Sequence, residues 1–134
     1  LGASPAVVLK LGDDETCLPI YIGLWEAISI RNALKQEVPP RPLTHDLFVE
    51  FMKSYDIMLK ELVIDSLEDG VYYARLIFEK DRHEMSMDCR PSDGIALSLR
   101  CGAEILVEPG VFSGSSVCFS DISGLEDLDT YLTG

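Results

Sequence analysis

The spacing of apolar and polar residues changes several times along the chain, and each change predicts a different element. Residues 6–11 and 16–22 are mostly apolar and flank the polar turn GDDE, a pattern typical of a β-hairpin. Residues 24–37 carry apolar side chains over one broad helical arc. The segment VPPRP that follows is expected to be extended, because a residue that precedes proline avoids the α region. A second helix is predicted to begin near Thr44, a good N-cap residue, with an apolar stripe that ends at Tyr55.

The second half of the chain predicts an antiparallel meander followed by a buried helix. Residues 57–67, 71–79 and 84–89 read as three strands joined by the turns EDG and KDRH, and alternation in the last strand places one sheet face in water. The stretch RPSDGIALSLRCG is apolar nearly all round from Ile95 to Cys101 and ends in a glycine stop, Gly102. It predicts a short central helix that the Ser92 hydroxyl caps.

The remaining residues predict small elements around this centre. Residues 103–107 read as another short strand, residues 111–120 as a loop or a weak strand, and ISGLEDLDTYLTG as an acidic closing helix. Helices and antiparallel strands in this order are typical of an α+β fold. The 134 residues, of which 47% are apolar, are enough for one domain with its own core.

Composition narrows the classes of function. The chain has 23 Asp and Glu residues against 11 Lys and Arg residues, a net charge of −12. Since affinity for nucleic acid comes mainly from Lys and Arg that displace counterions from phosphates, a broad basic groove is excluded. Contact with nucleic acid is therefore expected to be weak and local, through a few arginines or a metal ion.

The apolar segments and the cysteines bear on location. No stretch approaches the roughly 20 apolar residues of a membrane span, and the N-terminus lacks signal-peptide features, so a soluble protein is expected. The four cysteines are widely spaced without a C-x-x-C pair, which argues against a zinc site and favours free thiols in a reducing, cytoplasmic compartment. An even number of cysteines is also compatible with disulfides.

Two stretches, RPLTHD and RPSD, repeat one pattern at two predicted helix starts: an Arg-Pro pair, a hydroxyl and an aspartate. The residues are Arg41, Thr44 and Asp46 in the first stretch and Arg90, Ser92 and Asp93 in the second. Helix N-terminal N–H groups and an adjacent guanidinium could together receive a phosphate oxygen. Helix capping and ordinary ion pairs explain the same residues without any ligand, so both interpretations stay open.

His45 is the candidate for proton transfer, because histidine is the side chain that changes charge near neutral pH. Four carboxylates, Glu26, Asp46, Asp88 and Asp93, could instead collect a divalent cation such as Mg²⁺ or Mn²⁺, which prefers oxygen ligands and bridges to phosphate. Their spacing does not distinguish this from solvated or helix-capping carboxylates, so the metal and its ligands stay unknown.

Several blocks of sequence occur in the order and spacing of one known family. LPIYIG followed by EA, then PRPLTHDL, RPSDGIALSLR and GAEILV, resemble the bifunctional nuclease domain family from about Val7 to about Phe112. The resemblance implies a mixed sheet and the cleavage of DNA and RNA that is reported for some members. We therefore expect a single α+β domain with a mixed, largely antiparallel β-sheet packed by two to four helices. Residues 1–112 are expected to form the nuclease-like domain, and residues 113–134 a C-terminal extension of it that ends in a helix.

The positions that match the family's motifs are Glu26, Arg41, Pro42, Thr44, His45, Asp46, Arg90, Pro91, Ser92 and Asp93. The sequence departs from the family at GLW and SIRN in the first helix, at Gly94, where alanine is common, and in the residues after Phe112. These departures leave the motifs intact and concern oligomer contacts and partner binding.

The resulting hypothesis is a nuclease in which both Arg-Pro helix starts meet at one phosphate pocket. Arg41 and Arg90, supported by Thr44 and Ser92, are expected to hold the phosphodiester, and His45 to transfer the proton. The carboxylates that would hold a metal or orient the attacking water are Glu26, Asp46 and Asp93. Nucleic acid is the expected partner, as a weakly bound substrate, and a homo-oligomer is a further expectation. The alternative is a non-catalytic regulatory module whose pocket binds a small anion or an acidic segment of a partner.

Overall fold

The computed structural model describes residues 4–12, 15–122 and 128 as an α+β fold. Its elements, in chain order, are β1 (Ala6–Lys10), β2 (Thr16–Tyr21), α1 (Leu24–Lys35), α2 (Thr44–Ser54), β3 (Met58–Glu68), β4 (Val71–Lys80), β5 (His83–Cys89), α3 (Pro91–Cys101), β6 (Glu104–Val107), α4 (Pro109–Ser115), β7 (Val117–Cys118) and the short 3-10 helix η1 (Phe119–Asp121). The predicted fold class is confirmed.

The strands form two sheets, of which the larger is mixed. Its order is β5-β4-β3-β6, with β3 antiparallel to β4, β4 antiparallel to β5, and β6 parallel to β3. The predicted N-terminal hairpin is confirmed, with Leu9 opposite Leu18, but β1 and β2 pair with β7 in a separate three-stranded sheet. The larger sheet is therefore the one that carries the meander predicted from the alternating pattern.

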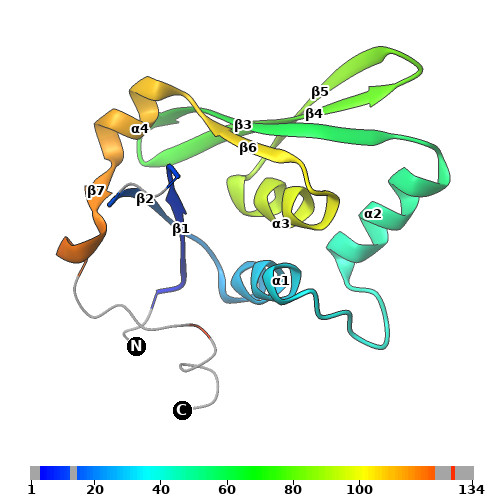
Figure 1. Cartoon of the computed structure of the whole chain (residues 1–134), viewed down its shortest axis with the longest axis horizontal. Helices are drawn as coiled ribbons and strands as arrows, with labels where there is room; N and C mark the ends of the chain where they lie inside the picture. The colour runs from blue at the N-terminus through cyan, green and yellow to red at the C-terminus, as the bar shows by residue number, and fades with distance from the viewer. Residues whose placement is uncertain (1–3, 13–14, 123–127, 129–134) are drawn as a thin grey trace.

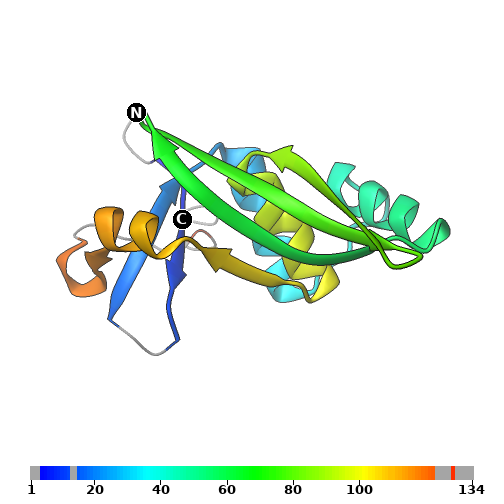
Figure 2. The same ribbon diagram turned by 90° about the horizontal axis from the view of Figure 1, so that it is seen from above.

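Helix α3 lies between the larger sheet and α1, so that it is covered on opposite sides (Figure 1). Its residues Ile95, Ala96 and Leu97 are buried, which explains why its sequence is apolar nearly all round. Gly102 follows the helix with φ 67° and ends it, as the glycine predicted. Helix α2 lies at one end of the layered structure, and α4 and β7 lie at the other (Figure 2).

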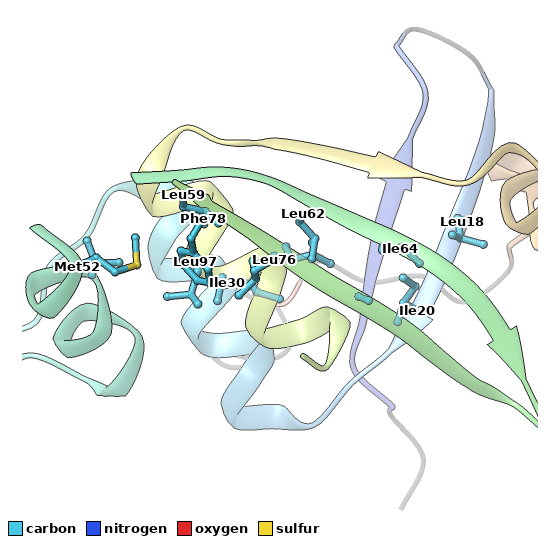
Figure 3. Close-up of a cluster of buried hydrophobic side chains, with 14 residues drawn as sticks. Leu18, Ile20, Ile30, Met52, Leu59, Leu62, Ile64, Leu76, Phe78 and Leu97 are labelled. Carbon is cyan, nitrogen blue, oxygen red and sulfur yellow. The ribbon is translucent and has the colours of Figure 1, made fainter. Parts of the chain in front are cut away.

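One hydrophobic cluster connects the layers (Figure 3). Leu62 and Leu76 point from β3 and β4 toward the helices, Leu18 extends the cluster to β2, and Met52 reaches it from α2. Because α1, α2 and α3 all contribute to this core, the starts of α2 and α3 are held in fixed positions relative to α1.

Both predicted hydroxyl caps are wrong. Thr44 is the first residue of α2 and Leu43 occupies the N-cap position, while α3 begins at Pro91 with Arg90 as its N-cap and Ser92 one residue inside the helix. Proline is favoured at the first helical position because its fixed φ suits the helix and its missing N–H has no partner there. The hydroxyl that follows Pro91 is consequently buried rather than placed at the cap.

Two further expectations change. The predicted apolar stripe of α2 leaves Leu47, Phe51 and Tyr55 exposed, since Met52 and the unpredicted Val49 provide the buried contacts. The segment predicted as a loop or weak strand forms α4 and the short β7.

The expected closing helix falls on residues that, apart from Ile122 and Leu128, lie outside the described part of the chain. No helix of the described residues is long and apolar enough to cross a membrane.

Candidate active site

Three helices bring polar side chains together around His45, in the first turn of α2. The Nε2 atom of His45 lies 2.9 Å from Asp93 Oδ1 on α3, and Nδ1 lies 2.6 Å from Ser29 Oγ on α1. Ser29 is buried, whereas the side chain of Asp93 is one third exposed. The imidazole is therefore anchored on its inner side by a hydroxyl and faces a carboxylate on its outer side.

The hydrogen-bond partners define the protonation pattern of the ring. An ionised carboxylate only accepts hydrogen bonds, so the proton between His45 and Asp93 belongs to Nε2. The Ser29 hydroxyl can donate to Nδ1 when the imidazole is neutral and accept from Nδ1 when the imidazole is charged. Ser29 thus satisfies the ring in both protonation states, which suits a histidine that gains and loses a proton.

Arg90 joins the outer side of this group. Its Nε lies 3.0 Å from Asp93 Oδ2 and its Nη2 lies 3.2 Å from Asp93 Oδ1, while its Nη1 lies 3.3 Å from Glu26 Oε2. Two carboxylates thus share one guanidinium, which leaves the group with one net negative charge when His45 is neutral. We call Glu26, Ser29, His45, Arg90 and Asp93 the histidine cluster. The Arg90 side chain is 65% exposed, so solvent reaches its guanidinium.

The same contacts shift the pKa values of the charged members. Burial by itself raises the pKa of Asp93, but the hydrogen bonds from Arg90 and His45 outweigh burial and hold this pKa below its ordinary value. The hydrogen bond to Asp93 and the charge of that carboxylate raise the pKa of Arg90. Asp93 is therefore ionised at neutral pH, in agreement with its role as the acceptor from His45.

Asp46 belongs to a different contact. Its Oδ1 accepts a hydrogen bond of 2.8 Å from Arg100 Nε, and its Oδ2 accepts one of 3.1 Å from the backbone N–H of Leu43 at the helix start. Arg100 also donates to the carbonyl of Ala96. Burial by itself raises the pKa of Asp46. The hydrogen bonds from Arg100 and from the Leu43 N–H together outweigh burial, so the pKa of Asp46 lies below its ordinary value. This pair joins α2 to the last turn of α3.

The structure joins four of the predicted site residues by direct contacts. Glu26, His45, Arg90 and Asp93 are connected by hydrogen bonds or ion pairs. Arg41 is exposed and makes no hydrogen bond or ion pair with a described residue, Thr44 is exposed at the start of α2, and Ser92 is buried. The two helix starts meet through the hydrogen bond between His45 and Asp93, and the joint binding of one phosphate by Arg41 and Arg90 stays a prediction.

Two residues of the site were missed from the sequence. Ser29 lies three residues after Glu26, a spacing that places both side chains on one face of a helix, and this was the signal that could have found it. Arg100 lies in the last turn of a helix that is otherwise apolar, where a cation needs a buried partner or a route to solvent. Nothing in the sequence indicated that its partner is Asp46.

A metal site does not follow from these side chains. Among the described residues, no group of three or more His, Cys, Asp or Glu side chains is arranged to hold a metal ion. The carboxylates of Glu26 and Asp93 are paired with Arg90, and that of Asp46 is paired with Arg100. Because guanidinium groups already neutralise Glu26, Asp46 and Asp93, these three carboxylates do not fit the metal that the sequence suggested.

Several known proteins are similar in sequence to this chain over most of its length. The chain is 39% identical over 122 residues to an uncharacterized protein of Mycobacterium tuberculosis, an alignment that covers 91% of this chain and 73% of that protein. It is 30% identical over 106 residues to bifunctional nuclease 1 of Oryza sativa subsp. indica, which covers 76% of this chain and 32% of the rice protein. Bifunctional nuclease 2 of Oryza sativa subsp. japonica is 30% identical over 107 residues, or 77% of this chain and 33% of that protein.

A sequence model of one protein family matches the part of the chain that contains most of the described fold and the whole histidine cluster. The sequence model of the bifunctional nuclease domain matches residues 7–120, which include every strand and helix described from β2 to α4 and all members of the cluster. This match supports a nuclease-related function. The chain belongs to the bifunctional nuclease domain family.

Proposed function

We propose that the histidine cluster binds and hydrolyses phosphodiester bonds of RNA and DNA. The observation that carries the proposal is the His45–Asp93 pair, which is fixed by Ser29 on one side and joined to an exposed arginine on the other. An oriented imidazole, a carboxylate and a guanidinium that solvent can reach are the groups that proton transfer and phosphate binding require. The family and the names of the rice relatives support the same reaction.

Phosphate binding falls to Arg90. Its guanidinium is 65% exposed and lies at the start of α3, where the positive end of the helix dipole also favours an anion. A phosphate competes with Asp93 and Glu26 for the same cation. When it takes over part of this contact, Asp93 loses nearby positive charge, and its affinity for a proton rises.

This competition provides the base that the reaction needs. In the free protein the proton on Nε2 of His45 is held by an ionised Asp93. Once Arg90 is drawn to the phosphate, Asp93 Oδ2 is released from Arg90 Nε and can accept a proton from a water molecule as the water oxygen attacks phosphorus, while His45 Nε2–H stays bonded to Oδ1. The ester bond to the leaving oxygen breaks, and the same proton then passes from the pair to that oxygen. One water is consumed, and the pair returns to its original state.

Arg41 is the second proposed phosphate contact. It is exposed and follows Pro39 and Pro40, which limit the conformations of the segment that presents it. Because the chain carries a net charge of −12, two arginines give only weak binding of a nucleic acid backbone. Homo-oligomerisation belongs to the same proposal, and the exposed Leu47, Phe51 and Tyr55 of α2 supply an apolar surface for it.

The experiment compares matched arginine variants. Wild type, Arg90→Ala, His45→Ala and Arg82→Ala are purified identically and incubated with single-stranded RNA and DNA, each with magnesium, with manganese and with chelator. Arg82 is exposed in the turn between β4 and β5, so its loss changes the net charge as the loss of Arg90 does. We expect Arg90→Ala to lower the rate about 10²–10³-fold and His45→Ala about 10²–10⁴-fold, with Arg82→Ala close to wild type. Equal degradation by all four proteins would identify a contaminant and refute the proposal.

A second candidate function is supported by the charge pairing within the cluster. Every charged member already has a partner of opposite charge, and the contacts join α1, α2 and α3. Ion pairs that hold three helices together in this way suit a non-catalytic module that binds a small anion or an acidic segment of a partner. In that case folded wild-type protein binds an oligonucleotide or phosphate without cleaving it, and His45→Ala alters stability without altering any rate.

A further inference from the structure

The tryptophan next to the histidine cluster is almost fully exposed. Trp25 is the only tryptophan of the chain, and 78% of its surface is accessible to solvent. Tryptophan is on average among the more deeply buried residue types. A second aromatic residue, Tyr21, is 72% exposed at the end of β2, three residues before α1 begins. Two large exposed rings therefore flank the short connection between β2 and α1.

The position of Trp25 relates it to the cluster. It lies in the first turn of α1, directly before Glu26 and four residues before Ser29, both of which contact cluster members on other helices. Residues four apart on a helix share a face, with their Cβ atoms about 5–6 Å apart. Trp25 thus lies one turn before Ser29 on the same face of α1, and directly before Glu26, whose carboxylate contacts Arg90.

We propose that Trp25 is the platform on which a base of single-stranded nucleic acid stacks while a neighbouring phosphate lies on Arg90. The inference rests on the proposed function and adds to it the form of the substrate. A base paired inside a duplex has its faces covered by its neighbours, whereas a base in a single strand is free to stack on an aromatic ring.

The negative net charge of the protein makes base stacking on Trp25 a useful source of affinity. A protein of net charge −12 gains little affinity from phosphates, and its cluster holds one cation between two carboxylates. Stacking does not depend on phosphate charge and tolerates any base, because every base has a π-face. An exposed indole beside an acidic site therefore supplies the affinity that the backbone contacts lack, without selecting a sequence.

Because Trp25 is the only tryptophan, its fluorescence reports on this position alone. The full chain is titrated with a short single-stranded DNA that carries phosphorothioate linkages, which resist cleavage. Parallel titrations use the same strand with abasic residues in place of its nucleosides, the matching duplex, and inorganic phosphate. We expect quenching by the single strand and much weaker quenching by the abasic strand, the duplex and phosphate.

Variants test whether the ring contributes affinity. Binding of a dye-labelled single strand is followed by anisotropy for wild type, Trp25→Ala, Trp25→Phe and Tyr73→Ala. Tyr73 is an exposed aromatic residue of β4 whose neighbour Ala74 is buried on the helix side, so Tyr73 lies on the opposite face of the sheet. Trp25→Ala is expected to weaken binding about 5- to 150-fold, Trp25→Phe less, and Tyr73→Ala not at all.

Three results would overturn the inference: equal quenching by the abasic strand, unchanged affinity of Trp25→Ala, or Trp25 emission that depends only on protein concentration. The last would show that a second copy covers the indole. Cleavage assays separate this inference from the proposed function. Quenching without cleavage supports stacking and refutes hydrolysis, whereas cleavage with wild-type affinity in Trp25→Ala refutes stacking and leaves hydrolysis standing.

Discussion

The contact between Asp46 and Arg100 predicts a large loss of stability from one substitution. The Arg100 side chain is 9% exposed and that of Asp46 is 20% exposed, with 2.8 Å between Nε and Oδ1. Asp46→Ala leaves this buried guanidinium without its carboxylate and removes the acceptor of the Leu43 N–H. Breaking a fully buried ion pair on one side costs about 3–5 kcal/mol. Here Arg100 keeps its bond to the Ala96 carbonyl, so we expect about 2–4 kcal/mol.

Urea unfolding followed by far-UV circular dichroism measures this free energy directly. The matched control is Glu84→Ala, which removes the partner of Lys60 from a surface pair whose side chains are 54% and 38% exposed. That substitution is expected to leave the free energy of unfolding close to the wild-type value, because an exposed ion pair contributes little to stability. If the free energy of unfolding of Asp46→Ala lies within about 1 kcal/mol of the wild-type value, Arg100 is solvated without Asp46. The view that this pair holds α2 against α3 would then be wrong.

Three further predictions concern the core, the acid limit and the two arginines. Gly94→Ala places a Cβ against Leu62 Cδ1 and 3.2 Å from Cys89 Sγ, and Leu62 is fully buried. The cost of overpacking, about 1–3 kcal/mol, should exceed the gain in helix propensity of about 1 kcal/mol, so the variant should be less stable than wild type. Urea unfolding that shows a more stable variant would refute this. Because the folded-state pKa of Asp93 is lowered, its charge stabilises the fold above the ordinary value of 3.8 and the benefit is lost as pH falls through the lowered pKa. Asp93→Asn should therefore be less stable than wild type at pH 7, with a gap that closes in acid; a constant gap in thermal scans would contradict it. If Arg41 and Arg90 hold one phosphodiester, their alanine substitutions should be non-additive in oligonucleotide affinity, whereas independent contacts would add within about 0.3–0.5 kcal/mol.

The free histidine cluster and its proposed working state differ in the partner of one side chain. Arg90 binds Asp93 and Glu26 in the structure, and it is the group assigned to phosphate. Its pairing keeps Asp93 ionised and His45 Nε2 protonated until an anion arrives. Under the proposed function, a substrate phosphate draws Arg90 away from Asp93 and so creates the proton acceptor for the attacking water, which links binding to the chemical step.

The sequence by itself determined the elements whose signals are local. The N-terminal hairpin, the meander of β3, β4 and β5, and the central position of α3 all followed from the period of apolar residues and from turn chemistry. These features depend on neighbours within a few residues. The motif residues around His45 and Asp93 were also found from the sequence, because both stretches repeat one pattern at a helix start.

The tertiary structure decided which of those residues meet. Apolar periodicity gives the side of a helix that is buried but not the helix that covers it. The predicted stripe of α2 therefore included the buried Met52 but missed Val49, and it also included Leu47, Phe51 and Tyr55, which are exposed. A parallel strand pair such as β3 with β6 is likewise set by a long connection, and no local pattern encodes its partner.

The histidine cluster shows the same division at the level of single atoms. Sequence placed His45, Arg90 and Asp93 at helix starts, but only packing of α1 and α2 against α3 brought Ser29 to Nδ1 of His45 and joined Arg90 to Glu26. Hydrogen bonds and ion pairs act over about 3–4 Å, a distance that three helices reach only when their core side chains fix their spacing. The chemistry of each residue is therefore local information, whereas its partner is a property of the whole fold.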